Sequence, residues 1–209
     1  MKNQKEIILI IITILIMGLV ICYTNHQINL MFIPQSLIYS GVIIFASVLG
    51  KKISSRYYDV EASHEIFGFQ RYGFSKKAHL KKSLKIGLIL PLLISFISGG
   101  SIKLLTFLQT ELKPLASRTT KRRGLKRYFE LKEFEISLIV FYGILSNIIL
   151  AIIANILNHP ILASYSLYYA TWNLIPFGQL DGTKIFFGSR ILYLISIILL
   201  TVSYLVILI

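Results

Sequence analysis

The sequence predicts an all-α polytopic membrane protein that forms a single membrane domain over residues 1–209. Of its 209 residues, 55% are hydrophobic and only 15% are charged. The mean hydropathy is +0.71. A soluble domain of this length does not carry so much apolar sequence, and the apolar residues gather in runs of membrane-helix length. We therefore expect a multi-pass integral membrane protein whose first partner is the lipid bilayer.

Six segments are apolar enough to enter a bilayer. They are residues 7–23, 30–49, 86–102, 136–157, 161–178 and 190–209. The first has a basic start, but no small-residue cleavage site follows it, so we expect a retained helix and not a signal peptide. Residues 7–49 then form two N-terminal transmembrane helices, and 190–209 forms a C-terminal one.

The formal charge of +13 is concentrated in two basic blocks, 51–85 and 103–132. In membrane proteins such blocks mark cytoplasmic loops and contacts with anionic headgroups. The loop 24–29 carries no Lys or Arg. We expect the N-terminus and both basic blocks to be cytoplasmic, with 24–29 outside. The basic stretches contain no recognition motif for nucleic acid, so no nucleic-acid partner is expected.

The third apolar segment, 86–102, is short, contains Pro91 and ends in Gly99-Gly100. If it crossed the membrane fully, the second basic block would lie outside, against the charge bias. We therefore interpret it as a re-entrant segment. Residues 111–135 are expected to form a surface loop followed by a short amphipathic helix near 124–134. This order places Asp181 on the same side of the membrane as residues 59–65.

The stretch 173–182 reads Asn-Leu-Ile-Pro-Phe-Gly-Gln-Leu-Asp-Gly. It sets Asp181 at the end of an apolar segment, where a carboxylate is costly and is a functional candidate by default. The stretch resembles the Asn-x-x-Pro-x-x-x-Leu-Asp-Gly signature of the site-2 protease family, the intramembrane zinc metalloproteases. The resemblance implies a three-helix core within 55–190, Asp181 as the third zinc ligand, and a transmembrane protein as substrate or partner.

A zinc hydrolase also needs two further ligands and a general base, which His-Glu-x-x-His supplies from one helix face. Residues 61–68 read Glu-Ala-Ser-His-Glu-Ile-Phe-Gly. In one register His64 is a ligand and Glu65 the catalytic base, but Gly68 stands where the second histidine belongs. In the other register Glu61 and Glu65 take the ligand positions, and Ala62 stands where the base belongs.

Neither register gives an intact zinc motif. His64 with Asp181 makes two ligands, too few for a tight zinc centre. Glu61, Glu65 and Asp181 would form an oxygen-only set, which suits Mg, Ca or Mn better than zinc. A proton or a basic side chain such as Arg71 could also compensate the acids in place of a metal.

A second resemblance lies in the segment 136–157. Gly143 and Asn147 match the family's Gly-Pro-x-x-Asn in spacing, although the proline is missing. A glycine and an asparagine four residues apart share one helix face, which favours close helix packing. The resemblance also implies that Asn147, together with Asn173, holds the backbone of a substrate. Packing alone is the alternative.

Three functions remain open from the sequence. The first is a divergent site-2-protease-like protein, weakly active or non-catalytic, that binds transmembrane segments. The second is an active intramembrane zinc metalloprotease that cleaves membrane-anchored proteins with an unusual ligand set. The third is an unrelated small polytopic protein, such as a transporter or an assembly factor, although the sequence has no inverted repeat of the kind transporters use.

Overall fold

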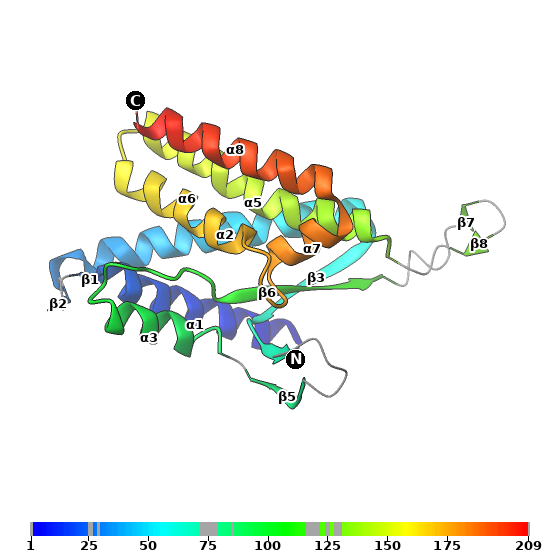
Figure 1. The fold of residues 1–209 in the computed structure, drawn as a ribbon, viewed down its shortest axis with the longest axis horizontal. Helices are drawn as coiled ribbons and strands as arrows, with labels where there is room; N and C mark the ends of the chain where they lie inside the picture. Colours follow the sequence, from blue (N-terminus) through cyan, green and yellow to red (C-terminus); the bar gives the residue numbers. More distant parts are fainter. Residues whose placement is uncertain are drawn as a thin grey trace.

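The computed structural model describes residues 2–24, 27–28, 30–71, 79–84, 86–115, 122–123, 126–127 and 131–208. Side chains are described for 4–24, 27–28, 30–68, 86–115 and 131–207. Within these ranges the chain is mostly helical, with short antiparallel ribbons between the helices (Figure 1).

Among the described residues, four helices are long and apolar enough to cross a membrane. They are α1 (Lys2–Cys22), α2 (Ile33–Tyr57), α5 (Glu133–Ile156) and α8 (Arg190–Leu208). A short 3-10 turn, η1 (Leu30–Phe32), leads into α2. The long helices run roughly along the long axis of the molecule (Figure 1), and α2 and α5 pack against each other at its centre. Four of the six apolar segments predicted from the sequence are thus long helices.

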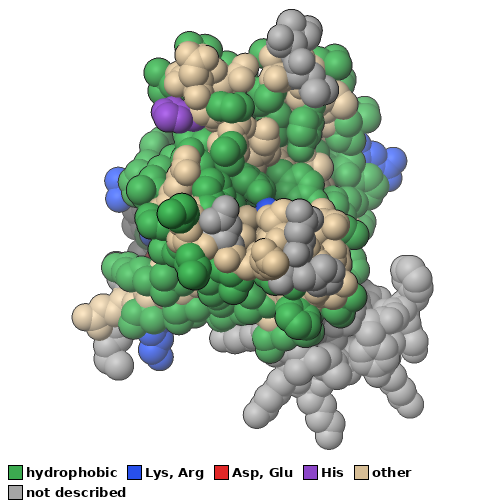
Figure 2. All heavy atoms as spheres, turned by 90° about the vertical axis from the view of Figure 1, so that its left-hand side faces the viewer, with side chains coloured by type: hydrophobic (Ala, Val, Ile, Leu, Met, Phe, Trp, Pro, Cys, Tyr) green, Lys and Arg blue, Asp and Glu red, His purple; other side chains and the backbone are tan. Residues whose placement is uncertain are grey.

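The side chains of these helices are distributed as in a membrane protein. Small hydroxyl side chains are buried between the helices, among them Ser40, Ser47 and Ser166. Large aliphatic side chains are exposed instead, such as Ile8 on α1 and Ile198 on α8. Figure 2 shows that hydrophobic side chains also dominate the end of the molecule where α1 ends. Lipid solvates aliphatic surfaces, and small residues let helices approach closely, so this distribution favours a bilayer as the solvent.

The fifth apolar segment is interrupted. Helix α6 (Pro160–Leu174) has only 15 residues, and α7 (Asp181–Gly188) follows after a non-helical connection. Pro176 disfavours helical geometry at the residue before it, which accounts for the end of α6. A Cβ at Gly182 would collide with the Leu174 carbonyl, so glycine is needed for α7 to begin against the end of α6. Helix α6 thus covers residues 161–174 of the span predicted for 161–178, and the last four residues of that span are not helical.

Residues 86–114 leave one side of the molecule and return to it. Helix α3 (Ile89–Ile97) runs toward the end of α1, where the rings of Phe96 and Tyr23 stack with centroids 6.1 Å apart. Lys103 Nζ then donates a hydrogen bond of 2.7 Å to the Ile21 carbonyl in the last turn of α1. The chain runs back through buried residues into strand β6 (Leu108–Pro114) (Figure 1).

The described part of the chain is mostly helical, as predicted, and it also contains four two-stranded antiparallel ribbons that the all-α prediction did not include. They pair β1 (Tyr23–Thr24) with β2 (Gln27–Ile28), β3 (Val60–Ile66) with β6, β4 (Phe69–Arg71) with β5 (His79–Leu84), and β7 (Arg122–Arg123) with β8 (Lys126–Arg127). The amphipathic helix predicted near 124–134 is replaced at 126–127 by β8, and α5 begins only at Glu133. The other residues of that segment up to 130 lie outside the described part of the chain.

Candidate functional site

Residues 60–66 form strand β3. The prediction that a helix carries the altered His-Glu motif is therefore wrong. Alternate side chains of a strand point to opposite faces. His64 is buried on one face, whereas Glu61 is exposed and Glu65 is half-buried on the other. The strand therefore separates His64 from both glutamates, and these three residues do not converge on one centre. The sequence already alternates in this way from Val60 to Ile66.

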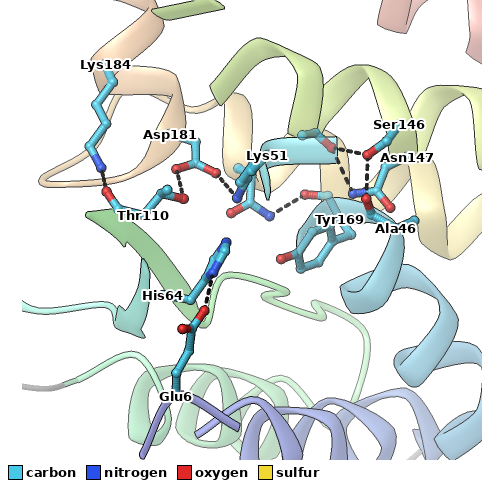
Figure 3. Close-up of polar contacts among 12 residues, drawn as sticks. Glu6, Ala46, Lys51, His64, Thr110, Ser146, Asn147, Tyr169, Asp181 and Lys184 are labelled. Atoms are coloured by element: carbon cyan, nitrogen blue, oxygen red, sulfur yellow. Dashed lines mark hydrogen bonds and ion pairs between the residues drawn. The ribbon is translucent and has the colours of Figure 1, made fainter. Parts of the chain in front are cut away.

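The carboxylate of Asp181, at the first residue of α7, lies in the interior (Figure 3). Its Oδ2 atom forms an ion pair with Lys51 Nζ from α2. Its Oδ1 atom accepts a hydrogen bond of 3.0 Å from Thr110 Oγ1 on β6. Thr110 pairs with His64 across the β3–β6 ribbon, so β3 lies beside the strand that contacts Asp181.

Lys51 reaches this position because α2 continues past the apolar run that ends near residue 49. The helix extends to Tyr57, six residues beyond Lys51, which corresponds to about 9 Å of helix. The lysine is only 2% exposed, and its stem lies across Gly143 of α5. A Cβ built on Gly143 would be 2.6 Å from Lys51 Cγ. Gly143 thus contributes to packing by leaving space for the Lys51 side chain.

The electrostatics of this centre follow from burial and from two cations. Burial alone would raise the pKa of the Asp181 carboxyl, but Lys51 and Lys184 together hold that pKa below its usual value. Lys184 Nζ donates a hydrogen bond to the Thr110 carbonyl, and burial lowers the pKa of its ammonium group. Asp181 is therefore ionised and compensated. A buried pair of this kind is costly to break, since removing one partner leaves a buried charge.

His64 has a different partner. Its Nδ1 atom lies 3.0 Å from Glu6 Oε1 on α1, and Lys52 Nζ lies 3.0 Å from the same oxygen. A carboxylate only accepts hydrogen bonds, so Nδ1 carries the proton when the imidazole is neutral. Nε2 is then a buried acceptor without a hydrogen-bond partner in the described part of the chain. Burial lowers the pKa of His64, which keeps the ring neutral.

The two asparagines predicted to hold a substrate are buried among the helices. Asn147 Nδ2 lies 3.4 Å from the Gly143 carbonyl, and Asn173 Nδ2 donates to the Tyr169 carbonyl at 2.8 Å. Both amides thus bond to their own helix, and the two side chains are 1% and 2% exposed. Their Oδ1 atoms have no hydrogen-bond partner among the described residues. In this conformation, packing describes both asparagines better than contact with a substrate.

The described residues do not assemble the donor set that zinc requires. Among the residues that the structure describes, no three His, Cys, Asp or Glu side chains lie together as a metal site would need. Asp181 already contacts a lysine and a threonine, and Glu61 and Glu65 face away from His64. The side chain of Arg71, one example of a compensating cation expected from the sequence, lies outside the described side chains. Lys51 compensates Asp181 instead.

Sequence reasoning missed Lys51, Thr110 and Lys184. One signal was available for Lys51: a buried aspartate needs a cation, and Lys51 follows directly on an apolar helix. Thr110 carried no such signal, because residues 104–110 show no charge or motif that would mark a strand beside Asp181.

One edge of β6 is free of strand pairing in the described part of the chain. The Phe67 N–H donates to the Phe107 carbonyl at 2.8 Å, and the Leu115 N–H donates to the Asp59 carbonyl at 3.1 Å. Hydrogen-bonded pairs alternate along an antiparallel ribbon, so the backbone groups of residues 108, 110 and 112 point away from β3. The bond from Lys184 to the Thr110 carbonyl agrees with this assignment.

A groove of about 720 Å³ lies along β6. Residues of β6 form one wall, and residues of α7, the start of α5 and the 178–179 turn form the other. The lining residues are Gln109, Thr110, Glu111, Leu112, Lys113, Ile136, Gly178, Gln179, Thr183, Lys184 and Phe187. The positive φ of Gly178, 59°, sets the turn at one end of the groove. Neither Asn147 nor Asn173 lines it.

No protein-family model, curated protein or solved structure matches this chain. The resemblance to site-2 proteases therefore rests on the sequence alone, in residues 173–182, the Gly143–Asn147 spacing and the altered motif at 61–68.

Proposed function

We propose that this protein is a non-catalytic membrane protein related to the site-2 proteases, in which the Lys51 ammonium group compensates the aspartate that would otherwise bind zinc. The protein binds an extended segment of a membrane-associated partner in the groove beside β6. The observation that carries the proposal is the buried ion pair between Lys51 and Asp181.

The helix face that approaches Asp181 supports the loss of catalysis. Two residues at i and i+4 on this face would have to supply two ligands in a His-Glu-x-x-His arrangement, with the base directly after the first. The residue of α2 that contacts Asp181 is Lys51, and the position four residues earlier is Ser47, also buried. Val48 then stands at the position of the base. None of the three side chains is suited to its role in zinc hydrolysis.

The free edge of β6 supports binding. Exposed strand edges accept an extended peptide as an additional strand, with main-chain hydrogen bonds supplying affinity and flanking pockets supplying specificity. Here the groove runs along such an edge and has apolar side chains in its walls, including Ile136 and Phe187. An extended segment that enters the membrane interface suits both features.

Restoring the missing ligands tests the proposal. The parent protein, purified with zinc and dialysed, is expected to hold well under one zinc per chain by metal analysis. The variant Ser47→His/Lys51→His is expected to approach one zinc per chain, because it places two imidazoles beside Asp181. Adding Asp181→Ala to that variant should remove the zinc again.

A matched control is Ser40→His/Ile44→His, an i, i+4 pair on the same helix that lies about two turns before Ser47 and Lys51. It should not gain zinc, since Asp181 is not beside it. One zinc per chain in the parent protein, lost on Asp181→Ala, would overturn the proposal in favour of an active metal centre.

A further inference from the structure

We infer that the groove beside β6 selects a peptide that carries a carboxylate, and that Lys184 is the residue that binds it. This inference rests on the proposed binding function and names the chemistry of the partner. Lys184 lies in the first turn of α7, between the buried Asp181 centre and the groove.

The hydrogen bonding of Lys184 leaves capacity for an anion. Its ammonium group has three protons, and the Thr110 carbonyl is its one hydrogen-bond acceptor among the described residues. The neighbouring Thr183 lines the same groove, and its Oγ1 atom is buried without a hydrogen-bond partner in the described ranges. An ammonium group and a hydroxyl at adjacent positions therefore both have donors available at one end of the groove.

The charge balance of the groove points the same way. Lys113 and Glu111, at the rim, lie 3.4 Å apart and compensate each other. Asp181 is the nearest carboxylate to Lys184 on α7, but it is already paired with Lys51. Asp181 and Glu111 also attract Lys184. Lys51, Lys113 and Lys184 therefore share two carboxylates, which leaves one positive charge in excess beside the groove. A carboxylate is the protein group that satisfies it best.

The position of Lys184 also gives the interaction a mechanical consequence. Its ammonium group donates a hydrogen bond to the Thr110 carbonyl, which is one of the main-chain acceptors that an added strand would use. A carboxylate that draws the ammonium group toward itself releases this carbonyl for the incoming backbone. Recognition of the acid and opening of the strand edge are then the same event.

The carboxylate is that of an Asp or Glu side chain, because Lys184 contacts Thr110 within β6 and not at an end of the strand. A C-terminal carboxylate is the alternative that the test examines. Three eight-residue peptides with the same alternating Val and Thr background are labelled with a fluorophore at the N-terminus. The first has a central Glu and an amidated C-terminus, and the second has Gln in place of Glu. The third has the Gln and a free C-terminal carboxylate. Binding to the full-length protein in phosphatidylcholine nanodiscs is followed by fluorescence anisotropy.

We expect the Glu peptide to bind about tenfold more tightly than the neutral peptide, as a charged hydrogen bond implies. Tighter binding of the free-carboxylate peptide than of the Glu peptide would overturn the assignment to a side-chain carboxylate. Lys184→Gln should remove the preference, Lys184→Arg should retain it, and Lys113→Gln at the rim should leave it nearly unchanged.

The outcomes distinguish the two proposals. If the neutral peptide binds and neither acidic peptide binds more tightly, the inference about Lys184 is wrong while the groove stands. A preference that survives Lys184→Gln would also overturn it. If none of the three peptides binds, the binding function proposed for the groove fails, and the inference fails with it.

Discussion

The centre at Asp181 and the groove beside β6 share two elements, β6 and α7, but their charged groups are compensated to different degrees. Thr110 contributes its hydroxyl to Asp181 and its carbonyl to the groove, and α7 contributes Asp181 to one and Lys184 to the other. In the centre, both oxygens of the carboxylate have partners. In the groove, a buried ammonium group has a single neutral acceptor among the described residues. We therefore expect the centre to stabilise the fold and the groove to bind a partner.

The largest effect is expected from Lys51→Met, which tests the structural half of this comparison. It leaves the Asp181 carboxylate buried without its cation, and such a change typically costs about 3–5 kcal/mol. We expect thermal unfolding in detergent to show a large loss, or the variant to fail to fold. Lys52→Met should cost much less, because Lys52 is 41% exposed and pairs with Glu6 at the surface side.

The double variant Lys51→Met/Asp181→Leu separates this explanation from simple loss of packing. Since both charges are removed together, much of the lost stability should return, and buried ion pairs replaced in this way are often neutral. A double variant as unstable as Lys51→Met alone would show that the pair is not what stabilises the centre.

The second effect concerns the glycine that accommodates Lys51. Gly143→Ala places a Cβ against the lysine stem, and overpacking of this kind costs about 1–3 kcal/mol. Gly41→Ala on α2 is the matched control, because the nearest atom to its new Cβ is Ile14 Cγ2 at 4.0 Å. The control should be neutral or slightly stabilising, since alanine favours a helix over glycine. Equal losses at both sites in thermal unfolding would contradict the packing described for Lys51.

The helices show how far hydropathy carries a prediction. The segments 7–23, 136–157 and 190–209 correspond closely to α1, α5 and α8, because a lipid-facing helix must be apolar over its whole length. The predicted helix 30–49 was too short. Its apolar window ends at Lys51 and Lys52, but the helix continues, because the first lysine finds a carboxylate inside the protein.

The site was harder to predict than the helices, for a physical reason. Asp181 was located as a buried acid from its own surroundings in the sequence. Its partners were not, because an ion pair between α2 and α7 is decided by tertiary packing. At residues 60–66 the similarity to a helical zinc motif predicts a helix, whereas the alternation of apolar and polar residues predicts the strand that forms. His64 consequently faces Glu6 and not a metal site.

The smallest effect is a dependence of stability on pH that arises at His64. Burial lowers the pKa of its imidazole in the folded protein, so the unfolded chain binds this proton first as the pH falls. The charged groups around it are Glu6 and Lys52 from one side and Lys51 and Asp181 from the other. The contribution of His64 is therefore complete above pH about 6.5, the ordinary histidine value, and is lost progressively below it.

The measurement is the midpoint of thermal unfolding in detergent at intervals from pH 8 to pH 4.5. We expect a decline below pH about 6.5 in the parent protein and a flatter profile in His64→Gln, which keeps a hydrogen bond donor for Glu6 but does not titrate. Asp181, whose pKa is also lowered, loses its contribution only in more acidic solution, below its ordinary value of about 3.9, and so does not contribute in this range. A profile that His64→Gln leaves unchanged would place the pH dependence elsewhere. In that case the contact between His64 and Glu6 would be no more sensitive to acid than the ion pair between Lys51 and Asp181.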